Sequence, residues 1–210
     1  MKEGNWTDIT QPLRNGMANW PEDTPFEFAL AATKEETGSA NIGQMTTSLH
    51  IGTHADAPFH FEETGKQLHQ LDPNTYIGTT RVIDVTKFPS VGRTELEQFN
   101  LDGARRLLLK TSEKNDPMTF PEDYKELHPD IGPLLQEKGI ILLGIDIPSV
   151  DLIHSKELAT HHSLHEAGVH IIENLMLADV EPGDYEFIAL PLAIHGADGS
   201  PVRAVIRPAE

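Results

Sequence analysis

The sequence contains no cysteine among its 210 residues. This absence excludes disulfides, thiolate nucleophiles, iron–sulfur clusters and cysteine-ligated zinc sites. It is also typical of a reducing compartment, so we expect a cytoplasmic protein. Basic residues are scarce too, because 16 Lys and Arg stand against 33 Asp and Glu, a formal net charge of -17. A surface that binds phosphates needs positive charge, so nucleic acid and anionic membranes are disfavoured as partners.

Long apolar runs are also missing. No stretch approaches the roughly 20 apolar residues of a membrane-spanning helix, and residues 1–19 lack the apolar run of a signal peptide. No long polar, Pro-rich or Gly/Ser-rich stretch marks a linker. We therefore expect one domain over residues 1–210, which is long enough to bury a core without disulfides or other cross-links.

Short apolar or alternating runs predict a chain rich in β-strands. The predicted strands are 6–10, 26–32, 45–51, 81–86, 106–111, 140–145, 170–172, 185–191 and 202–206. Two helices are predicted: residues 126–138, stopped by Gly139, and residues 155–167, with Ser155 as the N-cap. The apolar runs 107–110 and 140–145 are typical of strands covered on both faces. The pattern indicates a β-rich α/β or α+β domain.

Histidine is unusually frequent in this chain, and its positions are clustered. Nine of the 11 histidines lie in residues 50–69 and 154–170. Imidazole is the commonest metal ligand and a frequent general base, so this clustering points to a site.

The first cluster has its polar groups at even positions, namely His50, His54, Asp56 and His60. Alternation along a strand would turn all four to one face. A straight strand would separate the first two histidines by about 13 Å, too far to share one ion. The chain must therefore bend, and Gly52 permits a bend there. A solvated polar face is the plain alternative, but this combination favours a site for zinc or manganese.

The second cluster offers more candidate ligands than one site needs. On a helix, His161 and His165 are i, i+4 neighbours, and His162 with His165 is an i, i+3 alternative. Glu173 lies in the apolar run 169–177, where an unpaired carboxylate would be costly to bury. A metal ion or a buried salt bridge would satisfy it.

These motifs resemble those of the metal-dependent, cyclase-like amidohydrolase family, whose best-known members are bacterial-type kynurenine formamidases. The residues that carry the resemblance are 19–25, 50–60, 155–161, 183–192 and 200–204. The resemblance covers nearly the whole chain. It implies an α/β fold of the swivelling β/β/α type, in which a barrel-like sheet is flanked by helices. It also implies a homodimer or homotetramer.

The resemblance further implies two divalent metal ions per subunit, zinc by preference and manganese as the alternative. Its implied ligands are His50 and His54 for the first ion, His161 for the second, and Asp56 and Glu173 bridging both. His165 then has no role as a ligand, and His162 and His170 have none assigned.

For the reaction, the resemblance implies metal-assisted hydrolysis of N-formyl-L-kynurenine to L-kynurenine and formate. Metal binding lowers the pKa of water toward about 7, which makes hydroxide available at neutral pH. His60 is the implied acid/base that delivers a proton to the leaving aryl amine. Trp20 is implied to contact the substrate, although a Trp packed in the core is the plain alternative.

Two other functions stay open at this point. A related enzyme could open a cyclic amide such as isatin, because the metal motif activates water for any substrate. A non-catalytic metal-binding protein is the alternative of another class, and His60 argues against it, since storage needs ligands only. No Gly-x-Ser-x-Gly motif occurs, which disfavours a serine hydrolase.

Overall fold

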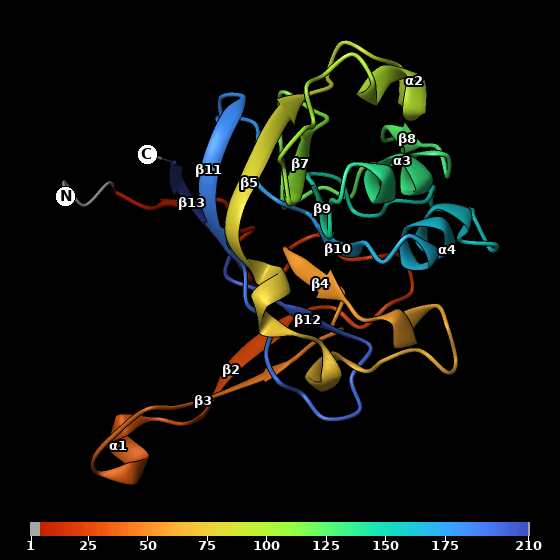
Figure 1. Ribbon diagram of the computed structural model, residues 1–210. Helices are drawn as coiled ribbons and strands as arrows, with labels where there is room; N and C mark the ends of the chain where they lie inside the picture. Colours follow the sequence, from red (N-terminus) through yellow and green to blue (C-terminus); the bar gives the residue numbers. More distant parts are fainter. Residues whose placement is uncertain (1–4, 210) are drawn as a thin grey trace.

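The computed structural model describes residues 5–209 and is built around one large, strongly curled sheet (Figure 1). Nine strands form it in the order β1-β13-β11-β5-β7-β9-β10-β4-β12. Curling gives the sheet the shape of a half-barrel, and the helices α2, α3 and α4 gather on its outer side. The predicted fold class, a mixed α/β domain with a barrel-like sheet flanked by helices, is confirmed.

The centre of the sheet is parallel. Its strands are β5 (Ile77–Asp84), β7 (Arg106–Lys110), β9 (Leu142–Ile145) and β10 (His170–Glu173). Side chains of successive residues point to opposite faces. Leu107 and Leu109 therefore pack toward the helices, while Leu108 packs into the concave side. Burial on both faces explains the continuous apolar runs, as predicted.

Antiparallel strands complete the sheet at both sides. They are β11 (Gly183–Ile188), β13 (Val205–Pro208) and β1 (Thr7–Asp8) on one side, and β4 (His54–Asp56) and β12 (Gly199–Pro201) on the other. The strand β12 pairs with β4 across more than 140 residues of chain, with Gly199 opposite Asp56. This pairing brings the C-terminal part of the chain next to the first histidine cluster.

Helices and smaller elements cover the outer face. They are α2 (Arg93–Leu96), α3 (Ile131–Glu137), α4 (Ala159–Glu166) and the parallel pair β6 (Ser90–Val91) and β8 (Glu126–Leu127). The 3₁₀ turns are η1 (Pro58–His60), η2 (Leu68–Gln70) and η3 (Pro73–Tyr76), and they lie elsewhere: Tyr76 packs into the concave side and Leu68 into a separate small cluster. The helices α3 and α4 pack on each other and on the sheet through buried leucines such as Leu134 and Leu164. No described helix has the length and apolar character that crossing a bilayer requires.

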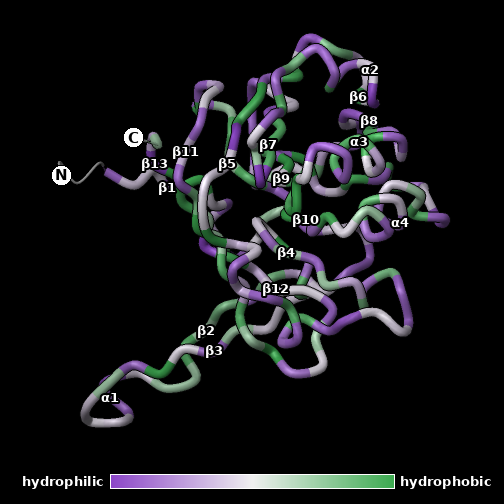
Figure 2. Tube along the Cα trace, viewed as in Figure 1, coloured by the Kyte–Doolittle hydropathy of each residue, from purple (hydrophilic) through white to green (hydrophobic). Residues whose placement is uncertain are grey.

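A two-stranded arm projects from the body of the molecule (Figure 1). It consists of β2 (Glu27–Ala32), the short helix α1 (Lys34–Thr37) and β3 (Ile42–Thr46). Figure 2 shows hydrophobic stretches along it. Its side chains are nearly all exposed.

Several predicted boundaries were wrong. The strand predicted over 45–51 ends at Thr46, and bends replace it before β4. The helix predicted from 126 begins at Ile131, because the residue before Pro129 is disfavoured in a helix and residues 126–127 form β8. Ser155 is not the N-cap of α4: that position is Leu158, whose backbone N–H donates to Ser155 Oγ at 3.2 Å.

Candidate metal centre and active site

The structure brings together the five predicted metal ligands, although they come from different elements. His54 and Asp56 are on β4, Glu173 is on the neighbouring strand β10, His161 is on α4, and His50 lies in the bend before β4. Pairing of β4 with β10 sets His54 opposite Glu173.

The bend required between His50 and His54 is present at Gly52, whose φ is +57°. This left-handed conformation favours glycine. A Cβ there would lie 2.8 Å from a methyl of Leu13, which gives a second reason for glycine. The bend brings the two imidazole ring centroids to 5.1 Å. The prediction of a bend is confirmed, whereas regular strand alternation holds only from His54 to Asp56.

The centre of the cluster is a set of atoms that face one another without hydrogen bonding. His54 Nε2 lies 3.4 Å from Asp56 Oδ1 and 3.4 Å from Glu173 Oε2. His161 Nε2 lies 3.6 Å from Asp56 Oδ2 and 3.8 Å from Glu173 Oε1. Two ligands on one tetrahedral zinc ion stand about 3.4 Å apart when the bonds are about 2.1 Å long. The spacing of these atoms is thus that of metal ligands.

Two of these atoms, His54 Nε2 and Asp56 Oδ2, are buried and have no hydrogen-bond partner. A buried polar atom without a partner costs free energy. A divalent cation between nitrogen and carboxylate oxygens would satisfy both atoms at once. The residues present therefore fit a metal site.

Hydrogen bonds outside the cluster orient the imidazoles. His54 Nδ1 donates to the carbonyl oxygen of Gly52 at 2.9 Å, and His161 Nδ1 donates to Asp151 Oδ2 at 2.7 Å. In each ring the Nε2 lone pair is left to face the cluster, the arrangement by which proteins fix metal-binding histidines. Glu173 is also held, because its Oε1 accepts from the backbone N–H of Val150 at 2.8 Å.

Electrostatics within the cluster are strong. Burial alone would lower the pKa of His50, but hydrogen bonds to Asp198 and Asp56 outweigh it and raise the pKa to about 10. At His161 burial also lowers the pKa, but the hydrogen bond to Asp151 and the nearby carboxylates of Asp56 and Glu173 outweigh it and raise the pKa to about 10. The pKa of Asp56 lies well below its usual value, because the nearby imidazole of His161 and the hydrogen bond from His50 outweigh its burial. The site thus attracts positive charge.

His60 lies beside the ligands on the 3₁₀ turn η1. Its ring centroid is 3.8 Å from that of His50, and its Nδ1 is 3.6 Å from Asp198 Oδ2. The same carboxylate oxygen accepts from His50 Nε2 at 3.1 Å. The side chain of His60 is 33% exposed, so it can exchange protons with solvent.

A cavity of about 590 Å³ opens beside the cluster, and both His50 and Trp20 line it. The Trp20 ring packs edge-on against Phe120 at a centroid distance of 5.5 Å. Trp20 is half-buried and faces this cavity, so it is not a core residue. The volume is within the range that encloses a small organic ligand.

The family model described as "Putative cyclase" matches residues 7–152 of the chain. The chain belongs to the cyclase family. Two relatives of this cyclase-family protein are kynurenine formamidases, from Bacillus thuringiensis subsp. konkukian (strain 97-27) and Bacillus cereus (strain ATCC 10987 / NRS 248). They are 54% and 55% identical over 208 residues, which cover 99% of this chain and 100% of each relative.

Solved structures agree with the cyclase family's fold. One titled "The Structure Of Potential Metal-Dependent Hydrolase With Cyclase Activity" is 26% identical with a TM-score of 0.85, and the match covers 98% of both chains. Isatin hydrolase A from Ralstonia solanacearum, at 19% identity and a TM-score of 0.82, covers 98% of this chain and 92% of its own. At that identity the likeness concerns the fold alone.

Sequence reasoning missed two carboxylates in this cyclase-family protein, Asp151 and Asp198. Asp151 holds His161, and Asp198 contacts both His50 and His60. Asp198 comes just before the segment 200–204 that carries part of the family resemblance, and this position was the available signal. Asp151 carried no comparable signal, because a single carboxylate before a helix does not indicate which side chain it will contact.

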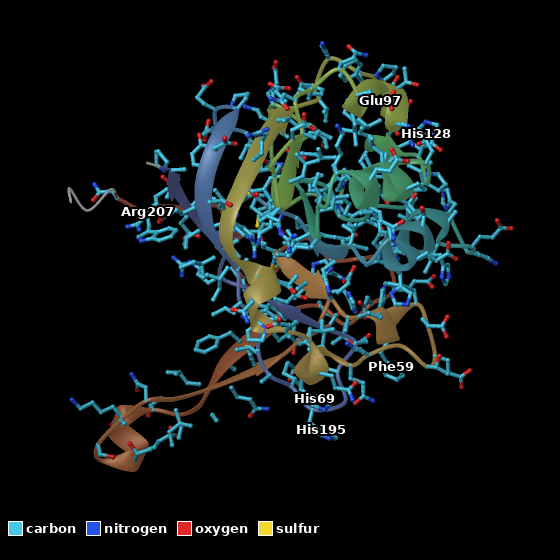
Figure 3. All side chains as sticks on the ribbon, in the orientation of Figure 1. Phe59, His69, Glu97, His128, His195 and Arg207 are labelled. Carbon is cyan, nitrogen blue, oxygen red and sulfur yellow. The ribbon has the colours of Figure 1, made fainter. Side chains whose placement is uncertain are left out.

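The remaining histidines lie around the site or away from it. The rings of His162 and His165 contact Phe61 at centroid distances of 5.6 and 5.7 Å and lie outside the ligand cluster. The pairing of His161 with His165 on one ion is therefore not what the structure shows. His69 and His195 stack on each other at 4.3 Å at the edge of the molecule (Figure 3).

Proposed function

We propose that the protein hydrolyses N-formyl-L-kynurenine to L-kynurenine and formate, as an arylformamidase of tryptophan degradation by the kynurenine pathway. The observation that carries this proposal is the buried His54–Asp56–His161–Glu173 cluster with unpartnered ligand atoms beside a cavity lined by Trp20. Full-length relatives named kynurenine formamidase support the choice of substrate.

Two divalent ions per subunit are proposed at this cluster, with zinc preferred over manganese by the usual order of affinities. His50 and His54 would hold one ion and His161 the other, with Asp56 and Glu173 shared by both. The ligand atoms of His50, His54 and Asp56 lie within 4.8 Å of one another, and so do those of Asp56, His161 and Glu173. When bound, such ions activate water and polarise a carbonyl oxygen.

His60 is proposed as the acid/base. Hydrolysis adds the oxygen of water to the formyl carbon and breaks the bond from that carbon to the aryl nitrogen. His60 takes up the proton that the water loses and delivers it to the departing nitrogen, so the amine leaves neutral. The formic acid formed releases the second proton of the water to solvent and becomes formate. Its place against His50, at 3.8 Å between ring centroids, sets the imidazole beside the reacting atoms.

Trp20 and Phe120 are proposed to bind the aromatic ring of the substrate. Their edge-to-face pair presents apolar surface at the cavity of about 590 Å³ that reaches His50. Binding the ring there would place the formamide toward the cluster.

A hydrolase of cyclic amides such as isatin is the alternative enzyme, and a non-catalytic metal-binding protein is the alternative of another class. The formamidase relatives disfavour the first. The contact of His60 with Asp198 disfavours the second, because storage does not need an oriented acid/base. Turnover of N-formyl-L-kynurenine and isatin by the zinc-loaded protein separates all three.

Asp198 is proposed to orient His60, and Asp198→Asn is expected to lower kcat about tenfold with little change in KM. The expected reason is that the variant loses the charge that holds His60 Nδ1 while it keeps the size of the side chain. Steady-state kinetics measures this change. The zinc content is measured as well, because Asp198 also contacts the proposed ligand His50. In a protein that already carries His60→Ala, Asp198→Asn should lower kcat hardly any further. A further tenfold loss of kcat in that double variant would show that Asp198 does not act through His60.

A homodimer or homotetramer is proposed in which the arm packs on another copy. Phe28 pairs with Met45 across the arm, and Leu30 follows on the same face. These three side chains are 50%, 55% and 47% exposed. A two-stranded ribbon with an uncovered apolar face is marginally stable alone, so a partner surface would stabilise it.

The double substitution Leu30→Asp with Met45→Asp is expected to reduce the molar mass in solution to that of one chain, because charge on this face prevents its burial. Light scattering after size-exclusion chromatography measures it. Glu35→Ala, at the tip of the arm, is the matched control and should leave the mass unchanged. An oligomer that survives the double substitution would rule the arm out as the contact.

We further propose one cyclase-like domain over residues 1–210 and a cytoplasmic location. Matches to relatives over 99% of the chain support the first. The absence of cysteine supports the second.

A further inference from the structure

A second, smaller cavity of about 210 Å³ adjoins the cluster at Asp56. Its polar lining consists of Asp56, Lys66, His165 and His170, with Phe61 among its apolar residues. None of its described lining residues also lines the larger cavity. This cavity gives a place to two histidines that the ligand set leaves unused.

The two cavities adjoin the cluster at different ligands. Of the five proposed ligands, all of them described residues, His50 lines the larger cavity and Asp56 lines the smaller one. The two side chains are in contact, with His50 Nδ1 and Asp56 Oδ1 at 2.9 Å. The larger cavity thus adjoins the cluster at His50 and the smaller one at the neighbouring ligand Asp56.

Basic groups dominate the small cavity, which is unusual in a chain with a net charge of -17. Lys66 and His165 lie near His170. Burial lowers the pKa of His170 most, and these two neighbours lower it further. Asp56 is the one acidic residue of the described lining, and its charge would be taken up by metal ions. Lys66 is then the charged side chain of the described lining, while two carboxylates outside the lining lie within charge range of its histidines, Asp72 near His170 and Glu62 near His165.

The size of this cavity limits its ligand. A volume of 210 Å³ is below the roughly 300–1,000 Å³ of pockets that enclose drug-sized ligands. It corresponds to about seven water molecules at about 30 Å³ each. An anion of a few atoms fits in this space together with some water.

We propose that the smaller cavity binds formate and lets it leave while kynurenine still occupies the larger cavity. This inference rests on the proposed hydrolysis, in which cleavage of the carbon–nitrogen bond leaves two products at one centre. The formyl carbon gains the oxygen of water and departs as a small anion, whereas the amine keeps the aromatic ring beside Trp20. Lys66 supplies the positive charge, and Lys66 and His165 offer N–H donors, that a carboxylate needs.

Inhibition by sodium formate tests this proposal on the zinc-loaded enzyme. Formate is expected to lower kcat for N-formyl-L-kynurenine even at saturating substrate, because it occupies a different cavity. Lys66→Met and His165→Gln should each raise the inhibition constant for formate about fivefold, the upper range for one exposed charge contact. Lys87→Met, an exposed lysine that lines neither cavity, is the matched control and should change nothing. Inhibition by kynurenine should be the same in all four proteins.

Formate inhibition that is unchanged in both cavity variants, or that saturating substrate abolishes, would overturn the proposal. A second experiment tests the formate cavity separately from the proposed hydrolysis. Zinc-loaded protein is titrated with carbon-13 formate in the absence of substrate, and NMR measures formate binding. Weaker formate binding in Lys66→Met alongside absent turnover would defeat the hydrolysis and leave the anion cavity standing. Normal turnover with formate binding independent of Lys66 would defeat the cavity alone.

Discussion

Replacing His60 by alanine is expected to lower kcat by about 10²- to 10⁴-fold, the usual contribution of a general acid/base. Bound zinc should stay at the wild-type level, because His60 stands beside the five-ligand set and the cluster keeps its own orienting hydrogen bonds. Absorbance of kynurenine measures the rate, and elemental analysis of the same sample measures the metal.

An aryl formate ester sharpens this experiment. Its leaving group departs as a stable anion and needs no proton, so the His60→Ala variant should lose much less rate on the ester than on the amide. A His60→Ala protein that keeps full rate on N-formyl-L-kynurenine would exclude His60 as the acid/base.

Replacing His54 by alanine is expected to abolish both zinc binding and turnover. His54 Nε2 is buried, has no hydrogen-bond partner, and lies 3.4 Å from both Asp56 and Glu173. Removing it removes a ligand from the centre of the cluster, whereas wild-type protein should bind two equivalents of zinc. Zinc at 100 times its dissociation constant contributes about 2.7 kcal/mol, so it should raise the wild-type Tm by about 5–10 °C.

The His54→Ala variant should show almost none of the increase in Tm that zinc produces in the wild type. His195→Ala is the matched control, because His195 is a surface histidine stacked on His69 away from the cluster. It should keep both the zinc and the shift. Two equivalents of tightly held zinc in His54→Ala would contradict the proposed ligand set.

Local reasoning from the sequence succeeded where neighbours along the chain decide the structure. The need for a bend at Gly52 followed from the reach of a strand and the length of a metal–nitrogen bond, and its φ of +57° agrees. The continuous apolar runs around Leu108 and Leu143 predicted strands buried on both faces, and both are fully buried.

Contacts between distant segments could not be predicted in this way. Asp198 reaches His50 because β12 adds to the edge of the sheet beside β4, and no periodicity in the chain specifies that pairing. The family resemblance selected His161 from the second cluster, where helical spacing alone left His161, His162 and His165 as alternatives. Tertiary packing of α4 on β10 is what separates them.

Element ends were the least predictable feature. Ser155 has the side chain of a good N-cap, yet α4 begins four residues later, after Leu158 in the left-handed conformation at a φ of 45°. The backbone amides at the start of α4 are satisfied by Asp151 instead, whose carboxylate accepts from Thr160 and His161 at 3.1 and 3.0 Å. A carboxylate upstream of Ser155 thus takes the place of the predicted cap, and it also orients His161.

The most direct test of the proposed function is the specificity constant of the zinc-loaded protein for two substrates. We expect kcat/KM for N-formyl-L-kynurenine to exceed that for isatin at least about 100-fold, because a site built for one substrate leaves its polar groups unpaired with another. Kynurenine and formate should appear in equal amounts. Cleavage of isatin with no kynurenine formed from N-formyl-L-kynurenine would contradict the proposed function.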